Sequence, residues 1–325
     1  MTAERPRGAP EPPSPSVSVI VCAHTARRWA NLQNAVASVS RQTLPALEIV
    51  VVIDFNDELE RLARAGLTDV LVLPNNRGRG LSGARQTGAD AARGTILAFL
   101  DDDAAADHDW LQRLVEAYAD PHVLGVGGTI SPAWDGERPR WFPPEFDWVI
   151  GCTYAGMPRE TAHVRNPIGA NMSMRASVFE QAGAFDPRLG RAHGAAALTG
   201  SAEETEFCIR AARAHPGSYW IFEPRARVEH SVPAERATLR YFARRCWVEG
   251  TAKALLTGIA GSEDGLSSER AYVRSVLPRA VARDLVRGVR GDRGGIPRAG
   301  AIVAGLAITV VAYLWTRTTV AARTR

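Results

Sequence analysis

The sequence of 325 residues contains only four cysteines, and they lie far apart. None belongs to a CxxC pair, which argues against a zinc site and against a disulfide scaffold. Their thiols are therefore expected to be reduced, as in a cytosolic domain. The four are Cys22, Cys152, Cys208 and Cys246.

The first 16 residues lack an apolar segment. They include five prolines and have little to bury. A secretory signal needs an apolar core, so this stretch does not predict one. We expect residues 1–15 to form a disordered leader.

The net charge of +4 hides an asymmetry along the chain. From Arg240 to the end there are 15 Lys and Arg against 6 Asp and Glu. Such a basic tail suits nucleic acid or anionic lipid equally well. The tail also contains Ala299–Thr316, 18 residues without a charge, which is just long enough to cross a bilayer core. This run favours a membrane and argues against nucleic acid as the partner.

The first half of the chain alternates strand-like and helix-like segments. Repeated strand–helix–strand units predict an α/β fold with a mostly parallel sheet and helices on both faces. In such sheets ligands bind beyond the carboxyl ends of the strands, where Asp54 and the run Asp101–Asp103 fall. The predicted strands are Val17–Ala23, Glu48–Ile53, Val70–Leu73 and Thr95–Leu100, and the predicted helices are Trp29–Arg41, Asp57–Ala65 and Leu81–Ala92.

The second half is less regular at first and then helical. Residues 131–167 are rich in Trp, Pro and Gly and predict no clear element. A helix is expected at 202–214, a strand at 218–222 and helices at 239–257 and 269–289, the last kinked or divided by Pro278. We divide the chain into a leader 1–15, an α/β domain 16–235, a basic amphipathic helical region 236–298, a transmembrane or membrane-anchoring helix 299–316 and a basic tail 317–325.

Asp101, Asp102 and Asp103 directly follow a buried strand. Three adjacent carboxylates repel one another, so a cation is expected among them. Mg²⁺ binds through one or two carboxylates and substrate phosphates, and an Asp-x-Asp pair points two side chains the same way. The alternative is that these residues cap the helix expected near 110–118. The run alone does not decide between the two.

Three further polar groups accompany this run. Asp54 ends the second strand, and the helix opening at Leu81 could meet an anion at its N-terminus. Glu203, Glu204 and Glu206 open another helix, where acidic residues are also favourable without any chemistry. His230 follows a strand-like segment, and a single histidine is more often structural than a ligand.

The order of these features resembles family 2 of the inverting glycosyltransferases, which have the GT-A fold. The resemblance spans about Ser16–His230. Its motifs read VIVCAHT at 19–25, VVVID at 50–54, NRGRGLSGARQTG at 76–88, GTILAFLDDD at 94–103, GANMSMRASVFEQAGAFD at 169–186, GSAEETEFCIR at 200–210 and VEH at 228–230.

The resemblance implies roles on the donor side. Asp54 would bind the nucleobase or ribose of a UDP- or GDP-sugar, and Arg85 would lie near the same donor. Asp101 and Asp102 would also lie at the donor. The metal, Mg²⁺ or Mn²⁺, would be held by Asp103 and His230 together with Asp101.

The resemblance also implies a general base and an acceptor side. Glu204 aligns with the base, which is usually Asp in the family, and Glu203 or Glu206 could replace it. Gly169 and Asn171 belong to the implied acceptor-side loop, to which we add Glu203. Trp141 and Trp148 could stack on a sugar, or their segment could be an apolar loop packed on the sheet.

The implied function is metal-dependent inverting transfer of a sugar from a nucleotide diphosphate donor to a membrane-proximal acceptor, either lipid-linked or a glycan. Tyr241–Gly250 with Lys253 is similar to bacterial and archaeal members that act on glycosylated polyprenyl phosphates. Because nucleotide sugars are cytosolic and arginines precede the apolar run, we expect a cell-membrane protein with a cytoplasmic catalytic domain.

Two other functions remain to be weighed. A nucleotidyltransferase would usually show a glycine-rich loop after the first strand, whereas His24–Arg28 contains no glycine. A catalytically impaired scaffold that binds nucleotide sugars at the membrane would retain the same motifs, and donor hydrolysis would separate it from an enzyme.

Overall fold

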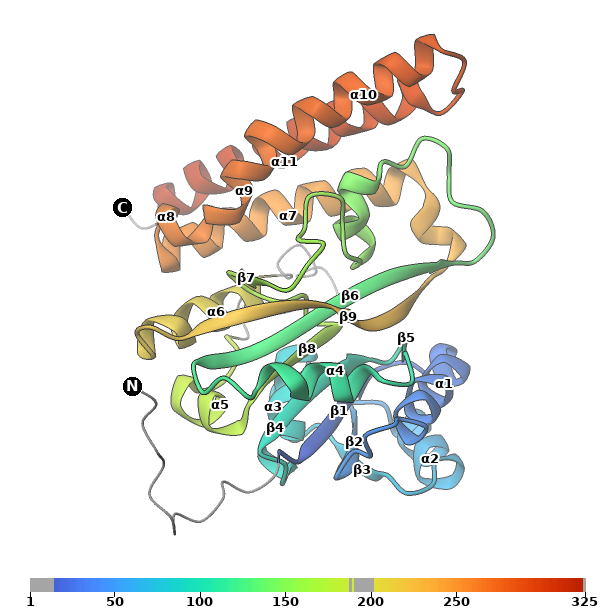
Figure 1. The fold of residues 1–325 in the computed structure, drawn as a ribbon, viewed down its shortest axis with the longest axis vertical. Helices are drawn as coiled ribbons and strands as arrows, with labels where there is room; N and C mark the ends of the chain where they lie inside the picture. The colour runs from blue at the N-terminus through green and yellow to red at the C-terminus, as the bar shows by residue number, and fades with distance from the viewer. Residues whose placement is uncertain (1–14, 187–188, 190–201, 324–325) are drawn as a thin grey trace, which may run out of the picture.

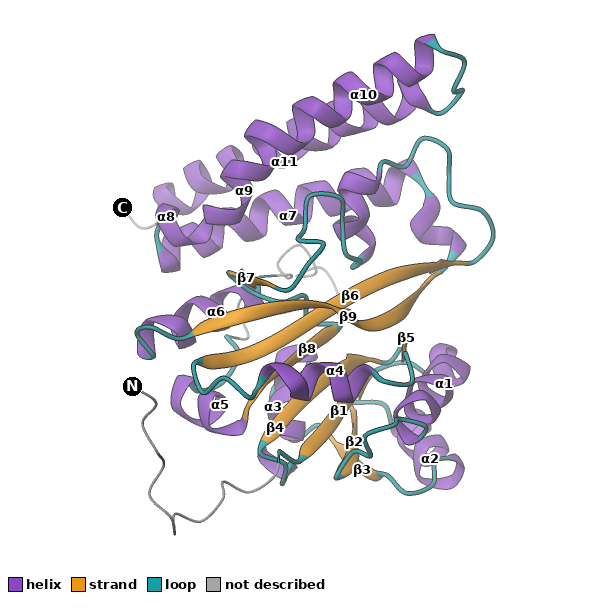
Figure 2. Cartoon of the chain, viewed as in Figure 1, coloured by secondary structure: helices purple, strands orange, loops and turns teal. Residues whose placement is uncertain are grey.

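A computed structural model of the protein describes residues 15–186, 189 and 202–323. Almost all of the predicted leader, Gly200 and Ser201 of the acidic motif, and the last two residues of the basic tail lie outside the described residues. One nine-stranded sheet runs through the described chain in the order β3-β2-β1-β4-β8-β6-β9-β5, with β7 paired to β9 (Figures 1 and 2).

The strands and helices have the following bounds. The strands are β1 Val17–Ala23, β2 Glu48–Ile53, β3 Leu71–Pro74, β4 Ile96–Asp101, β5 Ala104–Ala106, β6 Val123–Trp134, β7 Ala162–Val164, β8 Asn171–Arg175 and β9 Tyr219–Val232. The helices are α1 Trp29–Ser40, α2 Asp57–Gly66, α3 Leu81–Ala91, α4 Trp110–Ala117, α5 Ala176–Ala182, α6 Glu203–Ala214, α7 Leu239–Ala260, α8 Ser262–Gly265, α9 Ser267–Ala271, α10 Leu277–Val289 and α11 Gly295–Arg323. Short 3₁₀ turns cover Ala26–Arg28, Pro144–Ile150 and Ala234–Ala237.

The N-terminal half is the predicted α/β unit. β1 pairs in parallel with β2 and with β4, and β2 pairs in parallel with β3. β1 and β2 are rich in β-branched residues and are buried on both faces, as parallel strands covered by helices require. The register places Ala23 beside Ile53 and Cys22 beside Asp101, so three strands end at the same edge.

Beyond β4 the sheet is mixed. β8 is antiparallel to β4 and to β6, whereas β6 and β9 are parallel. β6 and β8 were not predicted, and β9 extends well past the strand expected at 218–222. β6 contains Gly125, where a Cβ would lie 2.3 Å from both the Ser173 carbonyl oxygen and the Trp220 ring. Glycine weakens a strand pattern in the sequence, yet here close packing requires it.

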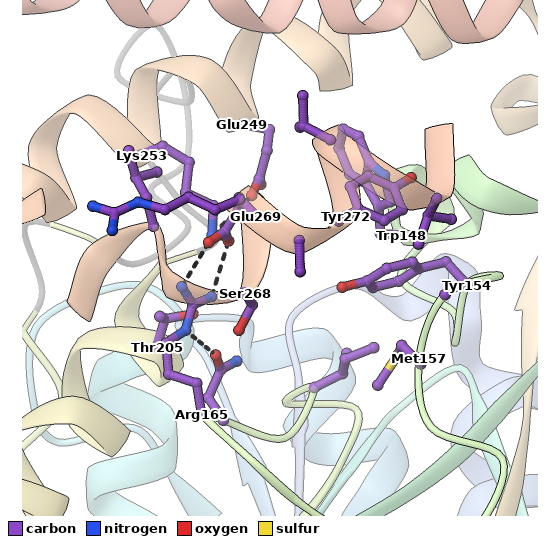
Figure 3. A pocket seen from close by; sticks show the side chains of 18 of the residues that line it. Trp148, Tyr154, Met157, Arg165, Thr205, Glu249, Lys253, Ser268, Glu269 and Tyr272 are labelled. Atoms are coloured by element: carbon purple, nitrogen blue, oxygen red, sulfur yellow. Dashed lines mark hydrogen bonds and ion pairs between the residues drawn. The ribbon is translucent and has the colours of Figure 1, made fainter. Parts of the chain in front are cut away.

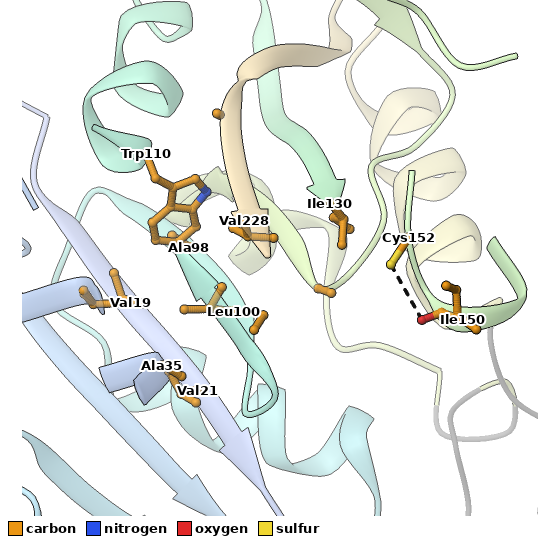
Figure 4. Packing of buried hydrophobic residues seen from close by; sticks show 14 of the residues in the cluster. Val19, Val21, Ala35, Ala98, Leu100, Trp110, Ile130, Ile150, Cys152 and Val228 are labelled. Atoms are coloured by element: carbon orange, nitrogen blue, oxygen red, sulfur yellow. Dashed lines mark hydrogen bonds between the residues drawn. The ribbon is translucent and has the colours of Figure 1, made fainter. Parts of the chain in front are cut away.

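Apolar side chains fill both faces of the sheet. Successive residues of β1 point to opposite faces, so Val19 and Val21 join one buried cluster and Ile20 joins the other. Figure 4 shows Val19 and Leu100 near Trp110 and Val228, which join α4 and β9 to the first cluster. The two clusters together hold the strand ends in fixed positions.

The C-terminal helices lie together at one end of the molecule, beyond β6 and β9 (Figure 1). The segment predicted as one helix at 269–289 stays helical but changes its hydrogen bonding just before Pro278. α9 leads into a π-helical turn, Tyr272–Val276, and α10 begins at Leu277 with Pro278 in its first turn.

α11 contains the predicted membrane helix. Gly295–Thr319 is long and apolar enough to cross a membrane: an 18-residue window within it has a mean hydropathy of 1.9, and 22% of that window is buried. The helix packs along α7 and α10. A Cβ at Gly250 of α7 would lie 2.2 Å from the Thr309 carbonyl oxygen, and one at Gly305 would lie 2.5 Å from the Phe146 ring. Glycines thus allow α11 to lie directly on α7 and on the 144–150 turn.

Candidate active site

Asp54 and Asp101 lie at the predicted edge of the sheet, where β2 and β4 end. Asp54 is buried and accepts hydrogen bonds from Asn75 Nδ2 at 2.7 Å and from the Gly80 backbone N–H at 3.0 Å. Its carboxylate therefore anchors the loop that leads into α3. That loop lies directly on the first turn of α3. A Cβ at Gly83 would lie only 1.9 Å from the Gly78 carbonyl oxygen, so the contact requires glycine at this position.

Asp101, Asp103 and His230 form one cluster, with ligand atoms that all lie within 4.8 Å of one another. The sheet brings them together across a long stretch of sequence. β5 pairs antiparallel with β9 so that Ala104 lies opposite His230, and the Ser231 N–H donates to the Asp103 carbonyl oxygen at 2.8 Å. The His230 Nε2 lies 3.2 Å from Asp103 Oδ1.

Two arginines outside the predicted set contact this cluster. Arg28 Nη1 lies 2.9 Å from Asp102 Oδ1 and 3.1 Å from Asp103 Oδ2, and Arg236 Nη2 lies 3.3 Å from Asp103 Oδ2. Burial alone would raise the pKa of Asp103, but His230 and the two guanidinium groups hold that pKa well below its usual range. Burial, reinforced by the neighbouring carboxylates and opposed by Arg28, raises the pKa of Asp102 to about 7.

The donor set fits a divalent cation. Two carboxylates suit Mg²⁺ or Mn²⁺, and the imidazole of His230 adds a common nitrogen ligand. Oδ2 of Asp102 is buried with no hydrogen-bond partner among the described residues. The other imidazole nitrogen, Nδ1 of His230, lies 4.0 Å from the Cys152 thiol, which is fully buried. The ring is therefore held from both sides.

Arg85 connects this cluster to the acidic start of α6. Its guanidinium is 2% exposed and lies over the rings of Phe99 and Phe185. Nη1 donates to Glu204 Oε1 at 2.9 Å, and Nη2 lies 3.7 Å from Asp101 Oδ1. Burial alone would lower the pKa of Arg85, but the carboxylates around it raise that pKa above its ordinary value.

The three glutamates of the acidic motif have different surroundings. Glu203 is 1% exposed and lies 3.7 Å from Arg85. Glu206 forms an ion pair at 2.8 Å with Arg210, one turn along the same helix. Only Glu204 among the three lines the large cavity described below. Of the three, Glu204 is therefore the one that lies at the cavity wall.

Gly169 lies against Glu204. A Cβ at this position would be 2.0 Å from Glu204 Oε1 and 2.5 Å from Arg85 Nη2. The backbone at Gly169 therefore lies directly against the Glu204–Arg85 ion pair.

Two predicted acceptor-side residues lie elsewhere. Asn171 is fully buried in β8, where its amide donates to the carbonyl oxygens of Thr129 and Ala226 and accepts from the Trp110 indole. All of these partners belong to the fold, so an acceptor cannot reach the side chain, and the assignment of Asn171 is corrected. Trp141 packs on Phe242 with ring centroids 5.6 Å apart and does not line the cavity, which matches the apolar-loop alternative.

A cavity of about 870 Å³ extends from Gly169 and Glu204 to the C-terminal helices. We call it the amphipathic cavity. Trp148 lines it together with Tyr154, Met157 and Tyr272, while Arg165, Lys253 and Glu269 lie on the opposite side (Figure 3). The cavity itself was not predicted, because its walls combine a loop with α7, α9, the π turn and α11, although Tyr241–Gly250 and Lys253 were already singled out in the sequence.

Comparisons with known proteins agree with this geometry. Residues 18–183 match the family described as Glycosyl transferase family 2. A glucosyl-dolichyl phosphate glucuronosyltransferase of Haloferax volcanii is 34% identical over 244 residues, which cover 74% of this chain and 77% of that protein.

Two solved structures have the same fold. A mannosyltransferase of Pyrobaculum calidifontis, in complex with GDP-Man and Mn²⁺, superposes with a TM-score of 0.57 at 19% identity and covers 93% of this chain and 87% of its own. GalNAc-T7 with UDP, GalNAc and Mn²⁺ superposes with a TM-score of 0.51 at 19% identity over 76% of this chain, which spans half of that one. The chain therefore belongs to glycosyl transferase family 2 and is a glycosyltransferase with the GT-A fold.

Proposed function

We propose that this glycosyltransferase moves a sugar, with inversion, from a nucleoside diphosphate sugar to a lipid-linked acceptor at the cytoplasmic face of a membrane. One observation supports this most directly. Arg85 contacts both Asp101, in the candidate metal cluster, and Glu204, at the start of the amphipathic cavity. A donor held at the metal cluster and an acceptor held in the cavity would therefore meet at Glu204.

In this proposal Glu204 is the general base. It would take the proton of an acceptor hydroxyl as that oxygen attacks the anomeric carbon, while the bond to the nucleoside diphosphate breaks on the opposite face. Asp101, Asp103 and His230 would hold Mn²⁺ or Mg²⁺, which neutralises the charge that develops on the departing diphosphate. The Mn²⁺ present in both related structures supports this choice of ion.

The donor side rests on the sheet edge. Asp54 fixes the loop before α3, and α3 carries Arg85. We assign this edge to the nucleotide, of UDP or GDP type as in the two related structures. Asp102, beside Arg28, would lie at the same end of the donor.

The acceptor assignment rests on the Haloferax relative, whose name gives a dolichyl phosphate acceptor, and on the C-terminal helices. We propose that α11 lies along the membrane surface. It packs along α7, which carries Arg244, Arg245, Glu249 and Lys253. If α11 crossed the bilayer, these charges would enter the hydrocarbon region, which is costly.

The outer face of the helical layer suits a lipid surface. Val303, Val311, Leu314 and Trp315 of α11 are between 54% and 63% exposed, and α10 adds three exposed apolar side chains and several arginines. A helix with an apolar face beside cationic side chains binds the boundary between headgroups and acyl chains. Because nucleotide sugars are cytosolic, we assign the protein to the cytoplasmic leaflet.

A screen of nucleotide sugars tests the reaction. The full-length protein in detergent, with an extract of polyprenyl-linked lipids, should release nucleoside diphosphate from one donor only when Mn²⁺ or Mg²⁺ is present. Glu204→Gln should lower transfer by roughly 10²–10⁴-fold. Glu206→Gln, on the same helix, is the matched control and should retain activity. Normal transfer by Glu204→Gln, or full activity in a chelator, would overturn the assignment.

Membrane attachment is tested by flotation on anionic vesicles. Trp315→Glu together with Leu314→Glu should release the protein, because both side chains would leave the apolar boundary. Leu47→Glu is the control, since Leu47 is 49% exposed but lies before β2, outside the helical layer. Equal flotation of the wild type, the Leu314→Glu/Trp315→Glu variant and Leu47→Glu would contradict the proposed orientation.

A further inference from the structure

The amphipathic cavity has a charged side. Lys253 Nζ lies 2.6 Å from Glu269 Oε1 and 3.3 Å from Glu249 Oε1, and Arg165 Nη1 lies 2.8 Å from Glu269 Oε2 (Figure 3). The side chains of Lys253 and Arg165 are only 11% and 13% exposed. Glu269 thus holds two largely buried cations at the cavity wall.

Among the described residues that line the cavity, cations outnumber anions. Five of these residues are arginine or lysine and three are glutamate, so this part of the lining carries an excess of positive charge. Arg245 and Lys253 lie eight residues apart on α7, with Glu249 between them at a spacing of four, so all three occupy one face of that helix. The cations are Arg165, Arg245, Lys253, Arg270 and Arg274, and the anions are Glu204, Glu249 and Glu269.

The remaining walls are apolar and continue to the outer surface. Leu306, Val310 and Tyr313 of α11 line the cavity, and Val310 is also 45% exposed on the face assigned above to the lipid surface. All five residues of the π turn line the cavity as well. Such turns recur at functional sites. An apolar chain could therefore pass from the bilayer along α11 into the cavity.

We propose that the amphipathic cavity binds a lipid phosphate. Arg165, Arg245 and Lys253 bind the phosphate, and the lipid chain lies along Leu306 and Val310. This inference rests on the proposed function and deepens it, since it assigns the recognition of the acceptor to the phosphate as well as to the chain. The group that accepts the sugar then projects from the phosphate toward Glu204.

The ion pairs of Glu269 hold the cations of the site in position before a phosphate binds. Without a phosphate, Glu269 pairs with both Lys253 and Arg165 and fixes their positions. A phosphate that enters between these cations either displaces the Glu269 carboxylate or binds beside it. The cations themselves therefore need little reorganisation. Fixed donors bind an anion more tightly than flexible surface lysines, because less side-chain entropy is lost.

Calorimetry on the full-length protein in one detergent tests the proposal with three probes: geranylgeranyl phosphate, geranylgeraniol and inorganic phosphate. The lipid phosphate should bind at least tenfold more tightly than either of the others. Equal affinity for the alcohol would show that the phosphate is not recognised, and equal affinity for inorganic phosphate would show a free-phosphate site. Either result overturns the proposal without any variant.

Variants then identify the residues. Lys253→Met and Arg245→Met should each weaken binding of the lipid phosphate about tenfold and leave binding of the alcohol unchanged. Arg244→Met is the matched control, because Arg244 is exposed on α7 and does not line the cavity. Unchanged affinity for the lipid phosphate in Lys253→Met and Arg245→Met would overturn the assignment of these residues.

The two proposals can fail separately. The binding experiment contains no donor and is independent of the screen of nucleotide sugars. If the protein binds the lipid phosphate but transfers no sugar in that screen, the proposed function alone is contradicted. Donor-dependent transfer by a protein that does not distinguish the lipid phosphate from the alcohol would contradict this inference alone.

Discussion

Gly169→Ala is the most direct test of the position of Glu204. The added methyl would lie 2.0 Å from Glu204 Oε1, and carbon–oxygen contacts below 3.0 Å are essentially never found, so the carboxylate must move by about 1 Å. A displacement of about 1 Å in a reacting group can cost roughly 10²-fold in rate. We therefore expect transfer to fall by about 10²-fold.

The fold should tolerate the same change. The atoms that the methyl meets first are the ends of the flexible Glu204 and Arg85 side chains, and backbone atoms are not among its three nearest contacts. Overpacking in a rigid core costs roughly 1–3 kcal/mol, and the cost here should lie at or below the lower end. The temperature of thermal unfolding should therefore change little. Gly300→Ala is the control, because nothing lies within 4 Å of that position.

A double-mutant cycle decides whether Gly169 acts through Glu204. Transfer is measured as release of nucleoside diphosphate in the presence of the lipid acceptor. If the methyl acts only by displacing the base, Gly169→Ala combined with Glu204→Gln should be no slower than Glu204→Gln alone. Normal transfer by Gly169→Ala, or losses that multiply in the double variant, would refute this account of the site.

Three further predictions address the metal cluster, the helical layer and the charged side of the cavity. Asp103→Ala should abolish Mn²⁺-dependent binding of UDP or GDP in calorimetry while metal-independent binding persists; unchanged Mn²⁺ dependence would exclude Asp103 as a ligand. Gly250→Ala should lower the unfolding temperature, since its methyl meets the Thr309 backbone and overpacking costs roughly 1–3 kcal/mol, whereas Gly258→Ala, with nothing within 4 Å, should be neutral or stabilising. Burial would raise the pKa of Glu269, but Lys253 and Arg165 lower it to about 2. The contribution of the ionised Glu269 to folding stability is therefore present above the unfolded pKa of about 4.3 and is lost as the pH falls toward 2. The stability difference between wild type and Glu269→Gln, from urea midpoints, should therefore shrink between pH 5 and pH 2, and a constant difference would contradict the ion pairs.

The sequence allowed the sheet edge to be predicted because the relevant signals are local. β1, β2 and β4 are short apolar runs, and each ends at or directly before polar residues. Parallel strands joined by helices must end at one edge, which brings Asp54 and Asp101 to the same side. β6 was missed because its glycines are selected by contacts with Ser173, Pro167 and Trp220, which are distant in the sequence.

The partners of the predicted site residues could not be derived in the same way. Arg28 reaches Asp102 and Asp103 from a 3₁₀ turn 74 residues away from Asp102, and Arg236 reaches Asp103 across 133 residues. Charge alone does not single out these two among the many arginines of the chain. Asn171 shows the opposite case: its motif matches the family, but its side chain is used entirely within the sheet.

The position of the C-terminal helices has a consequence for how they act. Phe242, Leu277 and Ile302 belong to the same buried cluster as β1 and β4, so the helical layer shares its core with the strands that position the site. Fully buried Asp284 of α10 pairs with Arg283 at 2.8 Å and with Arg298 of α11 at 3.3 Å, and Arg283 reaches Glu145 at 2.9 Å. Removal of α11 would expose Phe146 and one wall of the amphipathic cavity. Under the proposed function, the layer would therefore form part of the acceptor site and also attach the protein to the membrane, and substitutions on its outer face are the way to separate these two roles.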